Sequence, residues 1–304
     1  MSSIAVVGAG AWGCALARQA HRAGATVALW ARDPARVRDP SLTASAILPE
    51  GGHDLILLSV PVQHLRAVLG RFRPRAPVVV CGKGIEAQTG RLPLEIVDAV
   101  HPGVPGAVLS GPNFAGEIAA GLPAAAIVAA TDAALRASVI QALASAQFRL
   151  YGNDDPVGAQ FGGAAKNVMA IAAGVVIGAG LGDNARAALI TRGVAELTRG
   201  AAALGGRAET VAGLSGLGDL LLTCTGPASR NYQCGLALGR GSTLAEALAA
   251  APGVVEGVAT APALLARAEG VDLPICRAVA DLLAGQSTVA GAVAALLARP
   301  LRDE

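Results

Sequence analysis

The chain begins with a short apolar segment that runs directly into a glycine-rich turn. Residues Ser3–Val7 have a strand pattern, Gly8-Ala9-Gly10-Ala11-Trp12-Gly13 follows, and Cys14–Arg22 has a helical pattern. In a strand–turn–helix unit with this spacing, the first glycine makes the tight turn, the second admits a pyrophosphate and the third lets helix and strand pack closely. A second apolar segment, Thr26–Trp30, follows at once. The pattern predicts a Rossmann unit that binds NAD or NADP.

The end of the second predicted strand is where such units distinguish the two cofactors. An acidic residue there favours a free ribose 2′-hydroxyl, whereas arginine accommodates a 2′-phosphate. Arg32 and Asp33 are adjacent here, and Asp33 precedes Pro34, as in a turn. We therefore expect Arg32 to contact the cofactor, with NADP slightly favoured and use of both cofactors compatible with the sequence.

Continuous apolar segments predict a parallel sheet covered on both faces. Asp54–Val60 and Pro77–Cys81 are of this kind, and the second leads into Gly82-Lys83-Gly84. Ligands of such sheets bind beyond the carboxyl ends of the strands, where Lys83 falls. Three further strands are expected: Gly106–Leu109, Ala124–Ala129 and Gln147–Tyr151.

From Pro156 onward the pattern is helical. Ala/Leu-rich stretches separated by Gly and Pro replace the strand pattern, and Gly152–Pro156 has the composition of a connector. A chain of 304 residues is also long for one hydrophobic core. We predict an α/β fold with two domains: a doubly wound, mainly parallel Rossmann domain over residues 1–155 and an all-α domain over residues 156–304. The uncharged run Val168–Gly182 is predicted to be a buried helix, since it is too short to span a bilayer comfortably.

Lysine is rare in this chain. Of 24 Lys and Arg residues only Lys83 and Lys166 are lysine, and both lie next to glycine or alanine. Lysine, unlike arginine, exchanges a proton readily when it is buried. The four histidines, His21, His53, His64 and His101, all lie in the first half, which leaves Lys166 as the candidate acid/base for a carbonyl reduction.

Several polar segments have both a binding and a purely structural interpretation. Ser110–Ala115 follows a predicted strand and is either a plain turn or part of a site. Ser229-Arg230-Asn231, at an expected helix start, offers a hydroxyl, a guanidinium and an amide to a phosphate, although Ser229 alone would also cap the helix. Asp219 likewise could either belong to the site or merely cap the start of a helix.

Composition excludes other classes of protein. With 53% hydrophobic and 15% charged residues the chain is not disordered, and a net charge of +2 without a long basic run argues against nucleic-acid binding. Five scattered cysteines without a CxxC pair favour reduced thiols over disulfides or a metal site. We expect a soluble cytoplasmic protein without a signal peptide, metal ion or integral membrane association.

Taken in order, these segments resemble the bacterial NAD(P)-dependent glycerol-3-phosphate dehydrogenases. The matching blocks are Gly8–Gly13, Leu29–Arg32, Lys83–Glu86, Ser110–Glu117, Gly162–Asn167, Gly182–Gly193, Gly213–Asp219, Ser229–Asn231 and Val255–Gly257. The resemblance implies a Rossmann domain followed by a helical domain, with catalysis between them. The reaction would be reversible hydride transfer between the nicotinamide and C2 of dihydroxyacetone phosphate or sn-glycerol 3-phosphate.

The resemblance also implies roles for particular residues. Lys166 would accept the proton during oxidation, and Lys83 and Asp219 would complete the catalytic set. The implied substrate contacts are Lys83, Gly111, Asn113, Lys166, Asp219, Ser229, Arg230 and Asn231. The implied cofactor contacts are Gly8, Gly10, Ala11, Trp12, Gly13, Arg32, Lys83, Ala115, Arg230, Val254 and Glu256.

One segment departs from the family pattern. Between Arg32 and Asp54 the chain is shorter, and Leu48-Pro49-Glu50-Gly51 is the remnant of a usual Tyr-Leu-Pro-Gly segment. The departure affects the loop expected on the adenosine side of the cofactor, and therefore the choice between NAD and NADP. Two alternatives remain: a two-domain dehydrogenase that acts on a hydroxy acid or ketopantoate, and a non-catalytic NADP sensor. A homodimer is compatible with the sequence and is not required by it.

Overall fold

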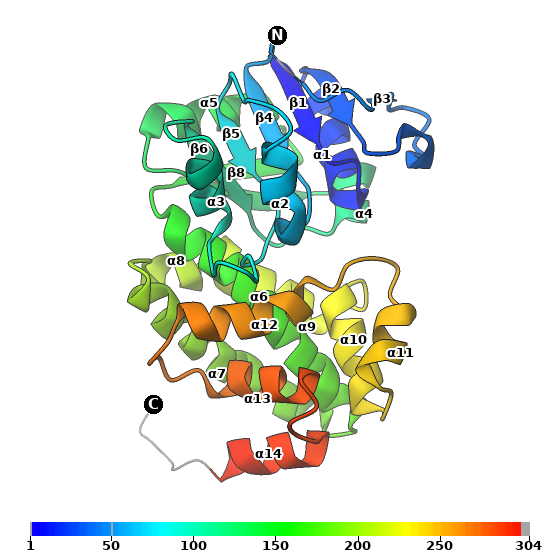
Figure 1. The fold of residues 1–304 in the computed structure, drawn as a ribbon, viewed down its shortest axis with the longest axis vertical. Helices are drawn as coiled ribbons and strands as arrows, with labels where there is room; N and C mark the ends of the chain where they lie inside the picture. The colour runs from blue at the N-terminus through cyan, green and yellow to red at the C-terminus, as the bar shows by residue number, and fades with distance from the viewer. Residues whose placement is uncertain (1, 50, 299–304) are drawn as a thin grey trace.

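A computed structural model describes residues 2–49 and 51–298, which form a sheet half and a helical half (Figure 1). The sheet has eight strands in the order β3-β2-β1-β4-β5-β6-β7-β8, and every neighbouring pair is parallel except β6 and β7. The strands are β1 Ser3–Val7, β2 Thr26–Trp30, β3 Ala44–Ser45, β4 Leu55–Leu58, β5 Val78–Val80, β6 Gly106–Ser110, β7 Ala124–Ala129 and β8 Phe148–Asn153. The predicted mainly parallel Rossmann sheet is confirmed.

Both faces of the sheet are buried, as expected for a doubly wound fold. On β1, Ile4 and Val6 belong to one apolar cluster and Ala5 and Val7 to another, because successive strand residues point to opposite faces. Helices cover the two faces: α1 Ala11–Arg22, α2 Val62–Leu69, α3 Pro93–Val100, α4 Ala115–Ala120 and α5 Ala133–Leu143. This double burial explains why the strands have no polar alternation in the sequence.

Some predicted boundaries were wrong. Helix α1 begins at Ala11 instead of Cys14, since Gly10 occupies the N-cap position. The expected connector Gly152–Pro156 is partly strand: β8 continues to Asn153, which pairs with the last residue of β7, and Asp155 caps the next helix. Glu50, in the shortened segment, lies outside the described residues.

The helical half is built around one long central helix, α6 Pro156–Gly178. The others are α7 Gly182–Ala203, α8 Ala208–Ala212, α9 Asp219–Thr225, α10 Arg230–Gly239, α11 Leu244–Ala249, α12 Glu256–Arg267, α13 Pro274–Leu283 and α14 Val289–Leu297. A π-helical turn over Leu214–Gly218 precedes α9, and a short 3-10 turn in the sheet half spans Pro34–Arg36.

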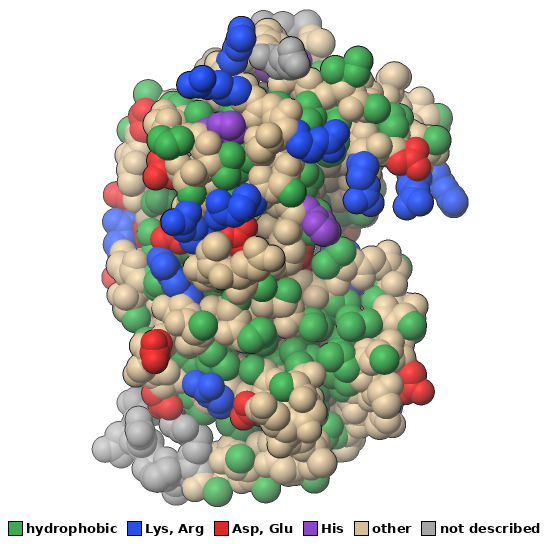
Figure 2. All heavy atoms as spheres, in the orientation of Figure 1, with side chains coloured by type: hydrophobic (Ala, Val, Ile, Leu, Met, Phe, Trp, Pro, Cys, Tyr) green, Lys and Arg blue, Asp and Glu red, His purple; other side chains and the backbone are tan. Residues whose placement is uncertain are grey.

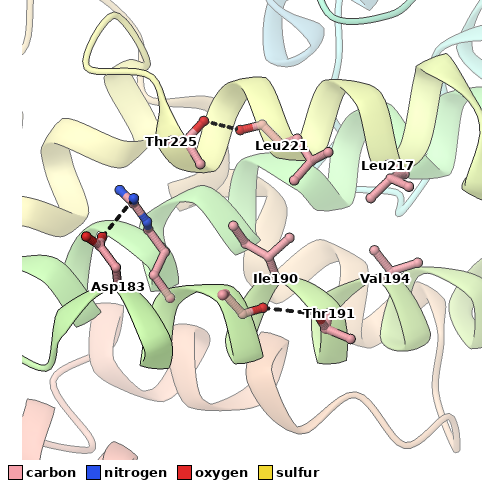
Figure 3. Close-up of a pocket in the computed structure, with 9 residues that line it drawn as sticks. Asp183, Ile190, Thr191, Val194, Leu217, Leu221 and Thr225 are labelled. Carbon is pink, nitrogen blue, oxygen red and sulfur yellow. Dashed lines mark hydrogen bonds and ion pairs between the residues drawn. The ribbon is translucent and has the colours of Figure 1, made fainter.

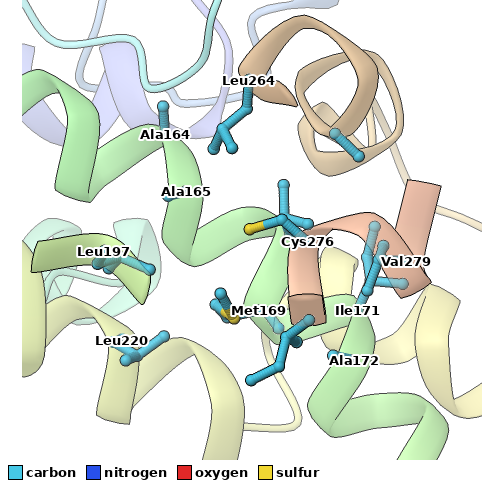
Figure 4. Close-up of a cluster of buried hydrophobic side chains, with 14 of the residues drawn as sticks. Ala164, Ala165, Met169, Ile171, Ala172, Leu197, Leu220, Leu264, Cys276 and Val279 are labelled. Atoms are coloured by element: carbon cyan, nitrogen blue, oxygen red, sulfur yellow. The ribbon is translucent and has the colours of Figure 1, made fainter. Parts of the chain in front are cut away.

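Small residues let other helices pack closely on α6. A methyl group at Gly174 would lie 2.1 Å from the carbonyl oxygen of Tyr232, and one at Gly235 would lie 2.0 Å from that of Ile171. The surrounding core joins α6, α7, α9, α12 and α13 (Figure 4). Helix α6 is long and apolar enough to cross a membrane, yet 83% of its apolar window is buried by the rest of the protein. The prediction of a buried helix in this region is thus confirmed, although the helix starts earlier and ends at Gly178.

A buried glutamate ties two helices of this half together. Glu196 on α7 is 1% exposed, and its carboxylate accepts hydrogen bonds from the backbone N–H groups of Ile275 (2.6 Å) and Cys276 (3.2 Å). It therefore caps the start of α13 from another helix, where Leu273 provides no side-chain cap. Burial raises the pKa of Glu196, and these two donors oppose that effect.

Candidate active site

The two lysines of the chain meet at one buried carboxylate. Lys83 follows β5, Lys166 lies on α6, and Asp219 is the first residue of α9. One carboxylate oxygen of Asp219 accepts a hydrogen bond from Lys166 at 2.6 Å, and the other accepts one from Lys83. Lys83 also donates to the carbonyl oxygen of Gly111 at 2.9 Å. Residues from both halves of the molecule therefore form a single charged cluster.

Glycines around the cluster allow this approach. A methyl group at Gly82 would lie 2.8 Å from the carbonyl oxygen of Val60, so only glycine lets the chain turn against the neighbouring strand end. A methyl group at Gly163 would lie 3.5 Å from Cγ of Lys83. That is an ordinary van der Waals distance, whereas the same methyl group would lie 3.1 Å from Oγ of Ser110, at the end of β6, which is a tighter contact.

Thr223 completes the environment of Lys166. Its hydroxyl accepts a hydrogen bond from the lysine ammonium at 2.8 Å and donates one to the backbone carbonyl of Asp219 at 2.6 Å. Thr223 was not among the predicted site residues. The signal for it was available, because positions 219 and 223 are four apart and so share one face of a helix. Asp219 does not act as a cap: its carboxylate binds the two lysines.

Burial and two neighbouring charges act together on Lys166. Burial lowers the pKa of Lys166 from its ordinary value to about 8; the charge of Asp219 opposes this shift and the positive charge of Lys83 adds to it. Lys166 thus changes its protonation state close to neutral pH. Its side chain retains 11% exposure and that of Lys83 18%, whereas that of Asp219 has 1%.

The predicted phosphate segment lies at the start of α10. The Ser229 hydroxyl accepts a hydrogen bond from the N–H of Tyr232 at 3.2 Å, so it caps the helix and keeps its own proton to donate. Arg230 is exposed, and it makes no hydrogen bond or ion pair within residues 2–49 and 51–298. An unpaired guanidinium at a helix N-terminus is well suited to an anion.

Asn231 lies deeper than its neighbours and binds other parts of the protein. It is 8% exposed, donates to Asn167 (2.9 Å) and accepts from the N–H of Gly257 (2.9 Å). Asn167 in turn donates to the carbonyl oxygen of Lys83 at 3.3 Å. The side chain of Asn231 therefore connects α10, α6 and α12, and one amide N–H remains for a ligand.

The loop after β6 brings two further predicted residues to the lysines. Gly111 has φ +150° and packs so tightly that a methyl group would lie 2.8 Å from Cα of Ala126, which leaves its carbonyl directed at Lys83. Asn113 donates to the carbonyl of Ala125 at 3.2 Å, while its amide oxygen is buried without a partner in the described residues. Ala115 begins α4 directly after this loop.

The glycine turn fits a dinucleotide. A methyl group at Gly13 would lie 1.7 Å from the carbonyl oxygen of Gly8, whereas one at Gly10 would meet nothing within 4 Å. The N-terminus of α1, which begins at Ala11, has no side-chain cap, so its first backbone N–H groups are available to an anion. The indole N–H of Trp12 is buried without a partner in the described chain. These features match a site for a pyrophosphate.

Arg32 and Asp33 differ in what they bind within the protein. Asp33 forms an ion pair with Arg36 (3.1 Å) and accepts from the N–H of Ala35, so it is used by the turn that follows. Arg32 is exposed and has no ion-pair partner among the residues described. Figure 2 shows basic side chains gathered on the upper edge of a hollow between the two halves of the molecule.

Glu256 and Val254 lie at the start of α12 on the helical side of the site. One carboxylate oxygen of Glu256 is buried and has no partner in the described residues, and burial raises the pKa of this group to about 7, opposed by the charge of Arg230. A methyl group at Gly84, next to Lys83, would lie 3.4 Å from that oxygen. Val254 is 45% exposed. Glu256 is thus close to the loop Gly82-Lys83-Gly84, and Val254 lies at the solvent-exposed edge of the site.

The lysine–aspartate cluster is not built from the side chains that most often bind metal ions. The cluster contains no histidine, and the described residues hold no group of three His, Cys, Asp or Glu side chains suited to a metal ion. All five cysteines are free.

Comparison with known proteins shows a match over both halves of the chain. The family model described as NAD-dependent glycerol-3-phosphate dehydrogenase N-terminus matches residues 3–46 and 39–136, and that for the C-terminus matches residues 155–294. The first match is split around residues 39–46, within the shortened segment.

Individual relatives are similar over nearly their whole length. The chain is 52% identical over 325 residues to glycerol-3-phosphate dehydrogenase [NAD(P)+] of Caulobacter vibrioides, covering 99% of this chain and 98% of the relative. It is 53% identical over 320 residues to the protein of the same name from Acidiphilium cryptum, with the same coverage. The crystal structure of glycerol-3-phosphate dehydrogenase from Coxiella burnetii superposes with a TM-score of 0.92 at 36% identity, covering 98% of this chain and 99% of that one.

Proposed function

Because the chain belongs to the NAD-dependent glycerol-3-phosphate dehydrogenase family, we propose that it interconverts dihydroxyacetone phosphate and sn-glycerol 3-phosphate with NAD(P). It is an oxidoreductase with a Rossmann fold and a helical second half. The observation that carries the proposal is the convergence of Lys83 and Lys166 on Asp219. The bound nicotinamide supplies the chemistry of giving or taking a hydride at C2.

Lys166 is the proposed proton donor and acceptor. With a pKa of about 8 it is mainly an ammonium at pH 7 and can protonate the alkoxide that develops as the carbonyl is reduced. In the oxidation direction its neutral form takes the proton of the C2 hydroxyl. Thr223 and Asp219 hold the amine by hydrogen bonds at 2.8 and 2.6 Å, which limits the directions in which it can donate.

Lys83 is proposed to hold the substrate oxygen rather than to exchange the proton. Its ammonium is fixed by the Gly111 carbonyl and Asp219, and it stays more exposed than Lys166. A fixed positive charge beside the reacting oxygen stabilises the negative charge that develops there. Asn113 is proposed as a neighbouring hydroxyl contact through its unpartnered amide oxygen.

The phosphate of the substrate is assigned to the start of α10. Ser229 and the unpaired Arg230 offer a hydroxyl and a guanidinium, and the helix N-terminus adds backbone donors. Asn231 contributes the one amide N–H that the protein leaves free. A phosphate monoester satisfies this set better than the carboxylate of a hydroxy acid or ketopantoate, because it presents three acceptor oxygens and a larger charge.

Cofactor contacts are proposed at the glycine turn and around the site. The turn residues Gly8, Gly10, Ala11, Trp12 and Gly13 would hold the pyrophosphate, and Ala115, Val254 and Glu256 border the nicotinamide side together with Lys83 and Arg230. Arg32 is proposed to favour NADP, since Asp33 is already paired with Arg36. We expect Arg32→Ala to raise the KM for NADPH by about ten- to a hundredfold, in line with a lost charge-assisted contact of roughly 1.5–3 kcal/mol. The KM for NADH should change little, and Arg73→Ala is the matched control, because Arg73 is an exposed arginine that precedes β5 at the amino end of that strand.

We propose a Rossmann domain over residues 1–155 and a helical substrate domain over 156–304, supported by the start of α6 at Pro156. We also propose a cytoplasmic enzyme without membrane insertion, which supplies glycerol 3-phosphate for glycerophospholipid synthesis. Association as a homodimer is compatible with the exposed apolar surface of the helical half.

The direct test measures loss of reduced-nicotinamide absorbance when dihydroxyacetone phosphate is added with NADPH or with NADH. Rapid loss is expected, and the ratio of the two rates reports on Arg32. If the protein reduces ketopantoate or a keto acid but does not reduce dihydroxyacetone phosphate, the proposal is refuted in favour of a related dehydrogenase. Tight cofactor binding without any turnover would indicate the NADP sensor instead.

A further inference from the structure

Of the three residues in the charged cluster, only Lys83 lies on a loop. Lys166 is on the buried helix α6, and Asp219 begins α9, whose Leu220 and Cys224 are fully buried in the core around α6. Lys83 instead lies between two glycines, in the segment that follows β5. Glycine leaves the backbone more freedom than any other residue. The position of this lysine must therefore be fixed by contacts that other parts of the protein make with its segment.

The carboxylate of the cluster does not depend on that segment for its position. Leu217 and Leu221, two residues to either side of Asp219, line a groove opposite Ile190 and Val194 of α7 (Figure 3). Helix α9 thus lies between α6 and α7. Asp219 is presented by a helix that has neighbours on two sides, and the lysine loop has to be brought to it.

One face of α2 holds the segment that follows β5. The side-chain amide of Gln63 donates to the carbonyl oxygen of Ile85 at 2.7 Å and accepts from the N–H of Ala87 at 3.0 Å. Arg66 is three residues further along α2 and therefore on the same face. Its guanidinium donates to both carboxylate oxygens of Glu86, at 2.9 and 2.7 Å. A bidentate pair of this kind has one defined geometry, so it fixes direction as well as distance.

The held segment is closed on itself and packed into the helical half. The N–H of Gly90 donates to the carbonyl oxygen of Glu86 at 2.8 Å, and the N–H of Glu86 donates to that of Arg91 at 3.0 Å. Ile85 and Leu92, at 0% and 1% exposure, belong to the core of the helical half. The segment is thus one compact turn, and bonds made to residues 85–87 also fix the lysine two residues before them.

We propose that three side chains, those of Gln63, Arg66 and Glu86, are positioning residues for Lys83. They hold its segment so that the ammonium meets Asp219, and their role in the reaction rests on the proposed function. Stability alone explains the ion pair poorly. The Glu86 side chain is 7% exposed, and a buried ion pair is often no more stabilising than apolar side chains of similar size. Its geometry is what an apolar pair would not supply.

The ion pair keeps its charge over the pH range in which the cluster titrates. The Arg66 guanidinium lowers the pKa of Glu86, burial opposes this shift, and the hydroxyl of Thr89, which donates to the same carboxylate, lowers the pKa further. Glu86 therefore stays ionised near pH 8, where Lys166 changes its protonation state. A change in the titration of Lys166 then reports on the position of Lys83 and not on a proton at Glu86.

Lysine NMR tests the positioning. With 13C at the lysine Cε only two residues give signals, and Lys83→Gln assigns them. Arg66→Met should release the segment of Lys83. Because the charge of Lys83 lowers the pKa of Lys166, that pKa should rise from about 8 toward the ordinary lysine value. The kcat for dihydroxyacetone phosphate should fall about a hundredfold, as is typical when a catalytic group is displaced by about 1 Å.

A second variant separates positioning from stability and from charge. Gln63→Ala removes the bonds to Ile85 and Ala87 but leaves no buried charge unpaired and changes no charge. It should fold, and any rise in the pKa of Lys166 must then come from the position of Lys83. If Arg66→Met does not fold, this variant alone decides.

Arg207→Met is the matched control. It also breaks an ion pair between arginine and a carboxylate, that of Asp154, next to the start of α6 and about 15 Å along that helix from Lys166. The titration of Lys166 should not change in this variant.

The proposal is overturned if Lys166 titrates in folded Gln63→Ala as in the unmodified protein, even when turnover is lost, or if Arg207→Met shifts it equally. An unmodified chain that does not reduce dihydroxyacetone phosphate refutes the proposed function instead, and the NMR titration still decides whether α2 positions Lys83.

Discussion

Removing the charge of Asp219 should lower the pKa of Lys166 still further. The value of about 8 is a balance: burial and the charge of Lys83 lower it, and the carboxylate at 2.6 Å opposes them. A nearby opposite charge typically shifts a pKa by about 1–3 units. In Asp219→Asn that support is lost while burial remains, so the pKa should fall to between about 5 and 7. Lys83→Gln should have the opposite effect, because it removes the repulsion.

The scarcity of lysine makes a direct measurement practical. Protein labelled with 13C at the lysine Cε position gives signals from two residues only, and Lys83→Gln assigns them. The Cε shift of Lys166 is followed as a function of pH in the unmodified protein and in both variants. Turnover is not needed, so variants with little activity remain informative. Thermal unfolding at each pH shows that the protein is folded, since removing one member of a buried ion pair costs roughly 3–5 kcal/mol.

The same balance governs the pH dependence of the reaction. Because Lys166 must be neutral to accept a proton, kcat/KM for oxidation of glycerol 3-phosphate should rise with pH up to about 8 and then level off. For reduction of dihydroxyacetone phosphate it should fall above that pH. A Lys166 signal that titrates in the ordinary lysine range, or that moves upward in Asp219→Asn, would refute this account of the cluster.

Other substitutions test other parts of the structure. Lys166→Ala should leave NADPH binding and the far-UV circular dichroism spectrum intact but abolish turnover; retained activity would remove this residue from the mechanism. Gly13→Ala should lower the melting temperature and prevent cofactor binding, because its methyl group would overlap a backbone carbonyl, whereas Gly10→Ala should fold normally and weaken only NADPH binding, as fluorescence titration would show. Glu196→Gln should cost about 1–3 kcal/mol in urea unfolding, because an amide has one acceptor for two buried N–H donors, while Glu209→Gln on the surface should have almost no effect; equal losses would contradict the capping role.

Local features of the sequence were enough to predict the first half of the fold. The strand, the glycine turn and the helix that follows are specified by neighbouring residues, and so β1 and β2 have the predicted limits. Continuous apolar segments likewise indicated strands covered on both faces. The limits of β8 and of its connector were less predictable, because they depend on pairing with β7 and on the cap that Asp155 provides.

The two lysines could be singled out from the sequence because lysine is rare in this chain. The carboxylate that binds both of them could be identified only from the tertiary structure. Lys83, Lys166 and Asp219 come from three elements that are far apart in the chain, and only the packing of α6 and α9 against the end of β5 brings them together. The lowered pKa of Lys166 is a property of that burial and of the two neighbouring charges. Composition and spacing carry no information about either, because desolvation and Coulomb interactions depend on distances in the folded chain.

The sequence is equally uninformative about residues whose role depends on what they contact in the fold. Sequence alone presented Asn231 as a free phosphate ligand, whereas in the fold its amide joins α6 to α12. Nothing in the neighbouring sequence distinguishes Glu196, and only the structure shows that it caps α13. The sequence by itself determined which residues have useful chemistry and which segments form strands or helices, since both are local properties. Which of those residues meet, and with what charge, was decided by tertiary packing, because it joins residues that sequence spacing does not relate.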